Sequence, residues 1–400
     1  MLNEAKNLMD WTFFKELLSI DSTTGREREV AEWLLKVLEA PSKQAFEVGD
    51  GTLNLLLSWG TPQVVFCTHM DTVPPYLPPV FEGGTVKGRG ANDAKGQLFA
   101  LYTACKELEA EGCSDFGLLL LSGEETGSWG AKAFAKTDFR APFLIVGEPT
   151  ENKMVSASKG TLSYNLTFTG EAFHSGYPQY GVSAVDLFNQ FYNALKTKDF
   201  GLDPELGETT WNVGLLHSDN PQNILSPELT CRLYFRTTFR SHQAVQDWMQ
   251  QMAGQAGHDA CGPAVAGHDA CGPVVAGHDA CGPAVAGHDA CGPVVAGHDA
   301  LGPAPVTPGL TGRLSVTRNG SGDAPAHYVT LPGLPSAPVS FGSDAPHLSN
   351  FGHKIICGPG SIRTAHRSDE HILVSDLETA VRQYKQMYHA LLPGAQPIEP

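Results

Sequence analysis

The chain has 400 residues, which is enough for more than one domain. Apolar residues make up 42% of it and charged residues 18%, the balance of a folded protein and not of a disordered one. The formal net charge of −16 argues against a nucleic acid or an anionic membrane as a partner.

The first twenty residues lack the basic start, apolar core and small-residue cleavage site of a signal peptide. No apolar run is long enough to span a bilayer. The nine cysteines are an odd number, with five scattered through apolar segments and four in a repeat. This usage predicts reduced thiols and a cytoplasmic location.

The first part of the chain alternates between apolar runs and helical spacing. The spacing predicts helices over residues 26–39 and 96–111. Short apolar runs predict strands at Leu53–Trp59, Val64–Thr68, Gly117–Ser122 and Phe143–Val146. Near-continuous apolar runs are typical of strands buried on both faces. We therefore expect an α/β layer with helices on both sides of a sheet.

From about Lys159 the pattern changes to polar and apolar alternation, which is typical of a half-exposed antiparallel strand. A small α+β domain is predicted there, with its elements at 161–170, 182–197, 209–217, 228–236, 241–253 and 312–319. The apolar pattern of the first part of the chain returns near 339–357, and residues 375–391 are predicted to form a last helix. We expect a first domain of residues 1–157 and 323–400, with a second domain of residues 158–322 inserted into it.

Residues 256–300 repeat the decapeptide AGHDACGPAV, and Gly-Pro in every copy breaks both helix and strand. A His/Cys array of this kind could bind metal. Near-identical copies instead favour a recently expanded repeat that is tolerated as a surface loop, because loop length costs little.

Two polar clusters begin the candidate site. His69 ends a predicted strand and Asp71 follows it, a pairing that suits a metal-binding imidazole and a carboxylate that orients it, although a histidine at a strand end is often structural. In GRGANDAKG, at 88–96, glycines allow a tight turn around Asp93, which suits a ligand shared by two metals; a plain turn is the alternative. A dinucleotide site is excluded, because the glycine spacing is wrong and residues 82–87 form no convincing strand.

Three further acids and a histidine complete the candidate site. Glu124 and Glu125 directly follow an apolar strand, where two acids are costly unless something binds them. One of them can hold a metal while the other takes a proton from water. Glu148 ends another strand, and His366 follows a glycine-rich turn.

Taken together the clusters predict a metal centre, since open α/β sheets carry their sites at the carboxyl ends of strands. Five side chains would supply N and O ligands to two metals, namely His69, Asp93, Glu125, Glu148 and His366. Glu124 remains as a base. The absence of cysteine ligands favours a hydrolytic zinc site. The sequence contains no G-x-S-x-G motif, which argues against a hydrolase with a serine nucleophile.

These clusters, in this order, resemble the zinc aminoacylase and carboxypeptidase metallopeptidase family, which includes acetylornithine deacetylase and succinyl-diaminopimelate desuccinylase. The resemblance covers nearly the whole chain except the repeat. It implies a mixed-sheet, three-layer α/β catalytic domain with an inserted α+β lid and dimerisation domain. It also implies Zn²⁺, with Co²⁺ or Mn²⁺ as alternatives, and a homodimer.

The resemblance also implies individual roles. Asp93 would bridge two metals, His69 and Glu148 would complete one site, and Glu125 and His366 the other. Glu124 would be the general base and then the acid, and Asp71 would orient His69.

In the inserted domain, GEAFHSGYP resembles the family motif whose histidine stabilises the oxyanion, often from the partner subunit, which gives that role to His174. Asn223 and Arg236 match substrate-binding positions, and arginine suits a carboxylate. Gly358 and Ser361 would add backbone donors. The repeat departs from the family pattern and puts lid packing and dimer geometry in doubt.

The expected activity is hydrolysis of the amide bond of an N-acyl amino acid. The fragment SASKG resembles the deacetylase branch and favours N-acetylornithine or N-acetyllysine. A dipeptidase or carboxypeptidase with the same metal core is the alternative. A non-catalytic metal- or ligand-binding protein is a third, against which the intact Glu124 counts.

Overall fold

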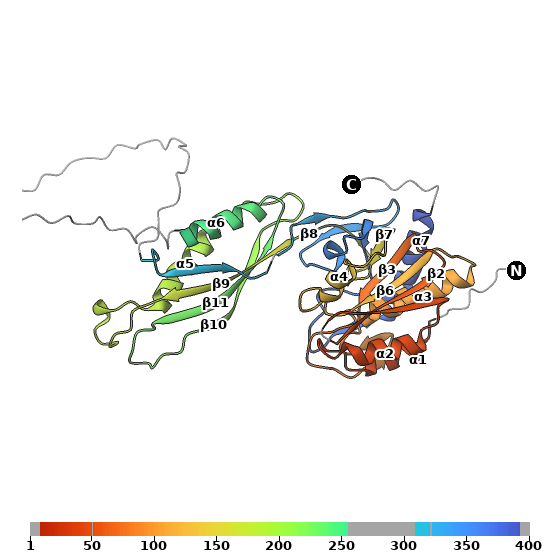
Figure 1. Ribbon diagram of the computed structural model, residues 1–400, viewed down its shortest axis with the longest axis horizontal. Helices are drawn as coiled ribbons and strands as arrows, with labels where there is room; N and C mark the ends of the chain where they lie inside the picture. The colour runs from red at the N-terminus through yellow and green to blue at the C-terminus, as the bar shows by residue number, and fades with distance from the viewer. Residues whose placement is uncertain (1–8, 50, 255–308, 321, 393–400) are drawn as a thin grey trace, which may run out of the picture.

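The computed structural model describes residues 9–49, 51–254, 309–320 and 322–392. The repeat at 256–300 lies outside the described residues, so its prediction as a surface loop stays a prediction. The described residues form two lobes, each built on its own sheet (Figure 1).

The first lobe is built on a six-stranded mixed sheet in the order β1-β2-β6-β3-β7-β15. Its strands are β1 (Ser42–Glu47), β2 (Leu53–Trp59), β6 (Phe116–Leu121), β3 (Val64–His69), β7 (Ala141–Val146) and β15 (Phe351–Ile356). β6, β3, β7 and β15 run parallel, whereas β1 and β2 pair antiparallel. The strands predicted from apolar runs are confirmed, and their parallel pairing brings their carboxyl ends to one edge.

Helices cover both faces of this sheet. Four of them pack on one face, α1 (Trp11–Ser19), α2 (Glu27–Val37), α3 (Lys95–Ala110) and α7 (Val374–Leu391), and the shorter α4 (Trp129–Phe134) packs on the other. Side chains of one strand alternate between the two cores: Phe66 belongs to the first, and Val65 and Cys67 to the second. This double burial explains the continuous apolar runs and confirms the three-layer α/β class.

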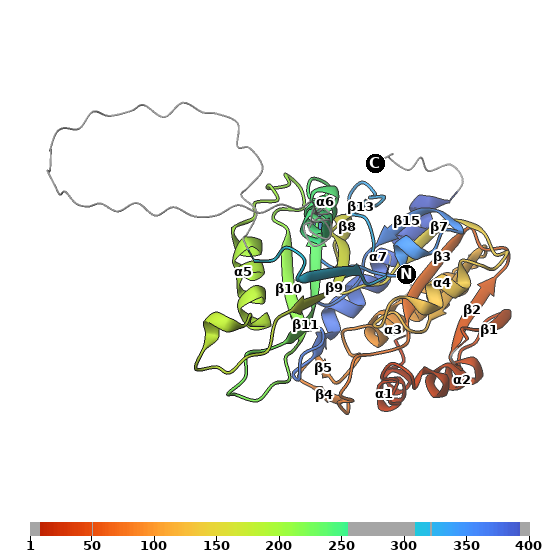
Figure 2. The ribbon, with the colours of Figure 1, turned by 60° about the vertical axis from the view of Figure 1, so that its left-hand side comes forward.

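The second lobe is a four-stranded antiparallel sheet in the order β10-β11-β9-β12. It comprises β9 (Gly160–Thr169), β10 (Thr210–His217), β11 (Glu228–Thr237) and β12 (Leu314–Arg318), with α5 (Ala184–Thr197) and α6 (His242–Gly254). Both helices pack on one face of the sheet, and the helices and sheet enclose a separate core that belongs to this lobe. Figure 2 shows this mostly green sheet beside the first lobe. The α+β nature of the inserted part is confirmed.

A small sheet connects the lobes, with β8 (Met154–Ser158) between β13 (Ala326–His327) and β14 (Ser336–Val339). β8 passes through Lys159 directly into β9. The predicted domain boundaries lie along these connections and stay a prediction.

The expectation that residues 82–87 form no strand is wrong. β4 (Val80–Glu82) and β5 (Thr85–Lys87) form a hairpin, and β16 (His371–Leu373) pairs with β5. Gly83 and Gly84 both have positive φ, at 56° and 79°, as a tight hairpin turn requires. The strands are too short and too exposed to show an apolar run.

Two general expectations can be compared with the described residues. The five cysteines among them are all free thiols. None of the helices in the described ranges combines the length and apolar character needed to cross a bilayer.

Candidate metal centre and active site

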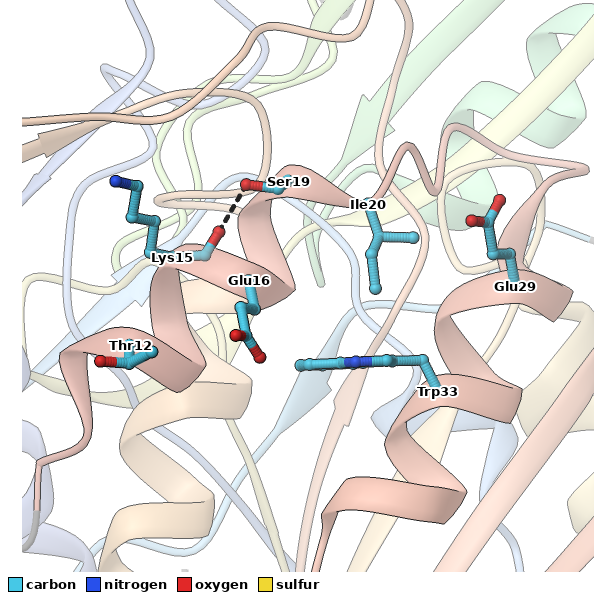
Figure 3. Close-up of a pocket in the computed structure, with 7 residues that line it drawn as sticks. All are labelled: Thr12, Lys15, Glu16, Ser19, Ile20, Glu29 and Trp33. Carbon is cyan, nitrogen blue, oxygen red and sulfur yellow. Dashed lines mark hydrogen bonds between the residues drawn. The ribbon is translucent and has the colours of Figure 1, made fainter.

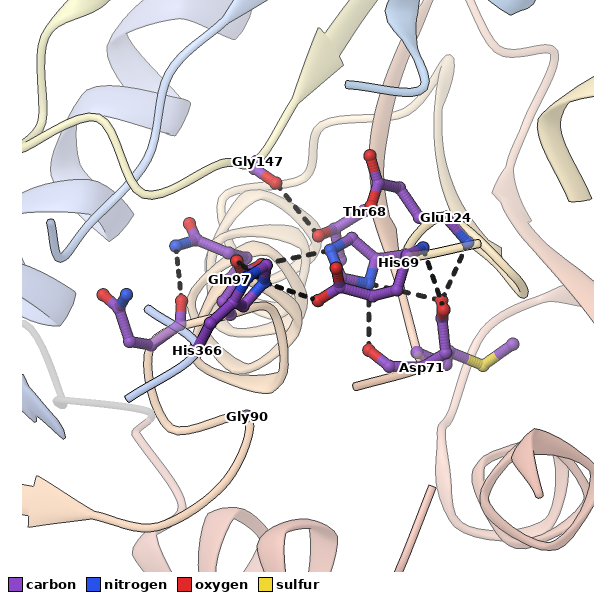
Figure 4. A network of polar contacts seen from close by, with 12 residues as sticks. Thr68, His69, Asp71, Gly90, Gln97, Glu124, Gly147 and His366 are labelled. Atoms are coloured by element: carbon purple, nitrogen blue, oxygen red, sulfur yellow. Dashed lines mark hydrogen bonds and ion pairs between the residues drawn. The ribbon is translucent and has the colours of Figure 1, made fainter. Parts of the chain in front are cut away.

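The candidate ligands meet at the carboxyl edge of the six-stranded sheet. His69 is the last residue of β3, Glu125 follows β6 by four residues, and Glu148 follows β7 by two. Asp93 comes from the loop before α3, and His366 comes from the turns between β15 and β16. Figure 4 shows His69 and His366 reaching this edge from different segments of the chain.

Asp93 lies between the two histidines. Its Oδ1 is 3.1 Å from His69 Nε2, and its Oδ2 is 3.3 Å from His366 Nε2. His366 Nε2 is also 3.0 Å from Glu125 Oε1. A carboxylate with one oxygen toward each of two imidazoles has the geometry of a bridging ligand.

The donor atoms fall into two groups that share Asp93. His69, Asp93 and Glu148 form one group, and Asp93, Glu125 and His366 form the other; within each group the ligand atoms lie within 4.8 Å of one another. These are the two ligand sets predicted from the sequence. A third grouping, of His69 with Glu124 and Glu125, is equally compact.

The carboxylates of the cluster are crowded and disfavour one another's negative charge. Glu148 is 4% exposed, and its Oε1 has no hydrogen-bond partner among the described residues. Burial, followed by the neighbouring Glu124 carboxylate, raises the pKa of Glu148 well above its usual range. Buried acids this close together need a compensating cation. The residues therefore fit a pair of divalent metal ions with N and O ligands.

Asp71 fixes the geometry around His69 and the two adjacent acids. It is fully buried, and its Oδ1 is 3.4 Å from His69 Nδ1. The backbone N–H groups of Glu124 and Glu125 donate to its two oxygens, each at 3.1 Å. The predicted orienting contact with His69 is present, and the same carboxylate also anchors the backbone after β6.

Glu124 has the environment of a proton-transfer group. Burial raises its pKa well above the usual range, an effect that His69 opposes and the nearby acids Asp344 and Glu125 reinforce. A carboxyl group with a raised pKa can accept a proton and release it again near neutral pH.

Glu370 holds the loop that carries Asp93, and sequence analysis missed it. Its carboxylate accepts the backbone N–H groups of Gly90, Asn92 and Asp93 at 2.9, 3.2 and 3.1 Å. It also forms a buried ion pair with Arg89. The sequence pattern of RSDEH contains no sign of this contact, because the two partners lie 281 positions apart.

The glycines of GRGANDAKG act in two ways. Gly88 and Gly90 have φ values of 139° and 83°, so they supply the predicted tight turn. Gly96 lies inside α3, where a Cβ atom would come within 2.1 Å of the Ala91 carbonyl oxygen. Gly96 therefore allows the helix to pack closely on the loop of Asp93.

A cavity of about 620 Å³ lies between the lobes, and the metal-ligand cluster opens into it. The first lobe contributes Asp93, Glu124, Glu125, Glu148 and His366 to its lining, and the second lobe contributes Thr161, Ser163, Arg232, Tyr234 and Arg236. Arg236 was predicted as a site residue, whereas Arg232 and Tyr234 were missed, because strand alternation alone does not say which polar face meets the other lobe.

Arg236 faces this cavity without a counter-charge. Its guanidinium lies 5.0 Å from the centre of the Tyr234 ring. Within the described residues it has no salt bridge and no hydrogen-bond acceptor, although it is only partly exposed.

His174 and Asn223 are not at the cavity within one chain. They lie together on the second lobe, where the Ser175 N–H donates to the Asn223 carbonyl at 2.9 Å. The Gly176 N–H donates to His174 Nδ1 at 3.1 Å. Neither residue lines the cavity of its own chain, and the predicted roles of His174 at the oxyanion and of Asn223 in substrate binding stay predictions.

The backbone N–H groups of Gly358 and Ser361, which were predicted to donate at the site, form hydrogen bonds within the chain. The Gly358 N–H donates to Thr150 Oγ1 at 2.9 Å, and the Ser361 N–H donates to Asn92 Oδ1 at 3.0 Å. Neither residue lines the cavity. The Ser361 contact ties the segment after β15 to the loop of Asp93, and the Gly358 contact ties it to Thr150 after β7. A substrate-binding role for either residue stays a prediction.

A separate hollow of about 490 Å³ lies between α1 and α2 and contains none of the predicted site residues. Figure 3 shows Glu16 of α1 and Trp33 of α2 facing each other across it. None of the metal-ligand groups lines this hollow, so the candidate site stays at the sheet edge.

Comparison with known proteins places the chain in a class. A sequence profile described as peptidase family M20/M25/M40 matches residues 65–297. The chain belongs to this family, which confirms the resemblance seen in its motifs and its class as a metal-dependent hydrolase.

Two relatives show moderate sequence identity to this chain. A probable carboxypeptidase of Emericella nidulans is 31% identical, over 94% of this chain and 88% of its own length. A peptidase M20 domain-containing protein of Schizosaccharomyces pombe is 28% identical, over 93% of this chain and 82% of its own length.

Solved structures share the fold at lower identity. A tripeptidase of Staphylococcus aureus superimposes with a TM-score of 0.70 at 17% identity, covering 97% of this chain and 98% of its own. A dipeptidase of Saccharomyces cerevisiae gives 0.62 at 10% identity, covering 98% of both chains.

Proposed function

We propose that this protein is a zinc-dependent carboxypeptidase or dipeptidase that cleaves the amide bond beside a residue with a free carboxylate. The observation that carries the proposal is the unpaired guanidinium of Arg236, which lines the same cavity as the metal-ligand cluster. Arginine binds a carboxylate through two parallel hydrogen bonds. The names of relatives as probable carboxypeptidases support this choice.

Two metal ions would be held by the groups that share Asp93, with His69 and Glu148 on one side and Glu125 and His366 on the other. When bound, such ions polarise the amide carbonyl and make an adjacent water easier to deprotonate. Asp71 keeps the His69 ring in place during turnover.

Glu124 would move the proton. Its partly buried carboxylate takes a proton from the attacking water and then donates it to the leaving amine nitrogen. Its backbone is fixed by Asp71, so the carboxylate is held at a constant place beside the metal ligands.

The second candidate activity is removal of the acetyl group from N-acetylornithine or N-acetyllysine. The fragment SASKG, in which Lys159 joins β8 to β9, favours it. Such a substrate also carries one free carboxylate for Arg236, so the same site accommodates it.

We also propose a homodimer in which the segment around His174 faces the cavity of the partner subunit. The support is a cluster of exposed aromatic side chains beside this histidine, with Phe173 40%, Tyr177 56% and Tyr180 62% exposed. Exposed apolar groups gathered on one segment are typical of an interface. Light scattering on the purified protein tests it, and a monomer would contradict it.

The decisive experiment combines metal analysis with a substrate panel. Dipeptides, tripeptides and N-acetyl amino acids are each offered beside their C-terminal amides. We expect about two zinc ions per chain, from the two ligand groups, and hydrolysis of the free acids only. Cleavage of acids and amides at equal rates would contradict the role of Arg236.

A variant separates catalysis from binding. Glu124→Gln should lower kcat by about 10²–10⁴-fold, the usual contribution of a general base, while zinc stays bound. Near-normal turnover in this variant excludes Glu124 as the base. Tight zinc binding without hydrolysis by the unaltered protein would instead favour a non-catalytic binding protein.

A further inference from the structure

The polar face of the second-lobe sheet forms one wall of the cavity. On β11, Arg232, Tyr234 and Arg236 point to the same side, because side chains alternate along a strand. The intervening Leu233 and Phe235 are fully buried toward α5 and α6. The sheet therefore separates a packed apolar core from an open polar trough that begins at the metal-ligand cluster.

The neighbouring strand β9 continues this trough. Thr161, Ser163 and Asn165 lie directly opposite Arg236, Tyr234 and Arg232 in the antiparallel register. All three are neutral hydrogen-bonding side chains. Among the residues of these two strands that line the cavity, the charged ones are the two arginines.

Arg232 presents its guanidinium to the trough. Its Nε donates to Asn165 Oδ1 at 3.1 Å, which orients the planar group. The terminal nitrogens have no hydrogen bond or salt bridge within the described part of the chain. On the other side, the facing residue Gly214 leaves open space, since a Cβ built there would meet no atom closer than 4.0 Å.

The remaining acid of this wall, Asp323, is held by neutral hydrogen-bonding groups of the protein. Asp323 Oδ1 is 3.4 Å from His347 Nε2, and its Oδ2 accepts the Thr161 hydroxyl at 3.3 Å. The second-lobe wall therefore offers two unpaired positive charges to a ligand, while the negative charge of the cavity is concentrated at the metal-ligand cluster.

The spacing of the two arginines indicates the length of the ligand. Four residues along a strand place their Cα atoms about 13 Å apart, at about 3.3 Å per residue. An extended peptide has a similar rise, so about four peptide residues span the same distance.

We propose that Arg232 is a second carboxylate-binding position and that the natural substrate is an acidic oligopeptide of about four residues. Arg236 binds its terminal carboxylate and Arg232 binds an acidic side chain near the other end. This inference rests on the proposed function and narrows its substrate class from short peptides to acidic ones.

The test measures binding apart from turnover. Zinc-loaded Glu124→Gln protein is titrated by calorimetry with a tetrapeptide that has Glu at its first position, and with the same peptide carrying Gln there. We expect the acidic peptide to bind about tenfold more tightly, or about 1.4 kcal/mol. Adding Arg232→Gln should abolish this preference.

Arg318→Gln is the matched control, since Arg318 lies on the same sheet but donates to Gln246 of α6 at 2.9 Å. It removes the same charge and should keep the preference. Equal binding of the two peptides, or an equal loss for both when Arg232 is replaced, overturns the inference.

Turnover by the unaltered enzyme distinguishes a failure of this inference from a failure of the proposed function. If it cleaves both tetrapeptides with the same kcat/KM and binds them equally, the inference fails and the proposed function stands. If it cleaves neither, while Arg232 still decides binding, the proposed function fails and the anion-binding position stands.

Discussion

At the scale of single residues, most of the metal-ligand cluster could be predicted because each ligand follows a recognisable local pattern. His69 ends an apolar strand, Glu125 and Glu148 follow apolar strands by four and two residues, and the carboxyl ends of parallel strands meet at one edge. Glu370 and Arg232 could not be found in this way, because their roles depend on contacts across the fold. The intrachain hydrogen bonds of the Gly358 and Ser361 N–H groups could not be found for the same reason.

Glu370 should control metal affinity without being a ligand. Replacing it with Gln weakens the charge-assisted hydrogen bonds to the loop of Asp93 and the ion pair with Arg89. Residues that support ligands typically contribute about 10–100-fold to affinity. We expect a loss of this size in a zinc titration against a competing chelator.

Asp369→Asn is the control, since Asp369 is a neighbouring surface acid whose side chain is 62% exposed. It should leave zinc affinity unchanged. If the two variants behave alike, the loop of Asp93 does not depend on Glu370.

Lys95 should make stability depend on pH. Burial lowers its pKa from 10.5 to about 7. Between these values the unfolded chain binds a proton that the folded chain does not, so the free energy of unfolding rises with pH across this window. Denaturant titrations of metal-free protein at several pH values measure the slope.

Lys95→Met should reduce that slope, and Lys15→Met, on the exposed side of α1, controls for the change in net charge. Parallel curves for the unaltered protein and Lys95→Met would contradict the prediction. Lys95→Met also removes two hydrogen bonds, which Lys95 Nζ donates to the carbonyls of Leu17 and Ile20 at 3.1 and 2.6 Å.

At the scale of elements, the long helices and the central strands were predicted, and short elements were not. α4 has six residues, and β4 and β5 have three each. Segments this short contain too few positions to show a hydrophobic period. They matter nevertheless, because β5 pairs with β16 and so joins the segments that flank Asp93 and His366.

The β8–β9 connection should be sensitive to small changes. A Cβ at Gly160 would come within 2.5 Å of the Asp323 carbonyl oxygen and 2.7 Å of Pro325. Gly160→Ala must therefore displace the backbone where the two connections between the lobes meet, at a cost of about 1–3 kcal/mol. Thermal unfolding measures the loss.

Gly214→Ala serves for comparison, because Gly214 lies in β10 with open space around it. It should shift the unfolding temperature much less. An equal shift would show that crowding at Gly160 is not the cause.

At the scale of the whole molecule, a cavity forms because two separately packed lobes meet. Each lobe has its own core, and the cavity lining is drawn from both. The sequence indicates an inserted domain, but the relative placement of the lobes depends on the β8–β9 and β12–β13 connections. Which face of the inserted sheet meets the metal-ligand cluster therefore could not be predicted.

Deletion of residues 257–300 should leave kcat and KM unchanged. Met252 and Leu310, on either side of the repeat, are both buried in the core of the second lobe, so the flanking elements are held without it. Steady-state kinetics of the deletion variant measure this. Loss of turnover with normal unfolding would show that the repeat takes part in function.

The hydrogen bonds between Glu370 and the Asp93 loop have a consequence for folding during synthesis. Ribosomes release a chain from its N-terminus, so the loop is synthesised long before the carboxylate that accepts its three N–H groups. His366 comes equally late. A nascent chain that stops short of them exposes crowded acids without their final geometry, and metal loading has to await release of the last segment.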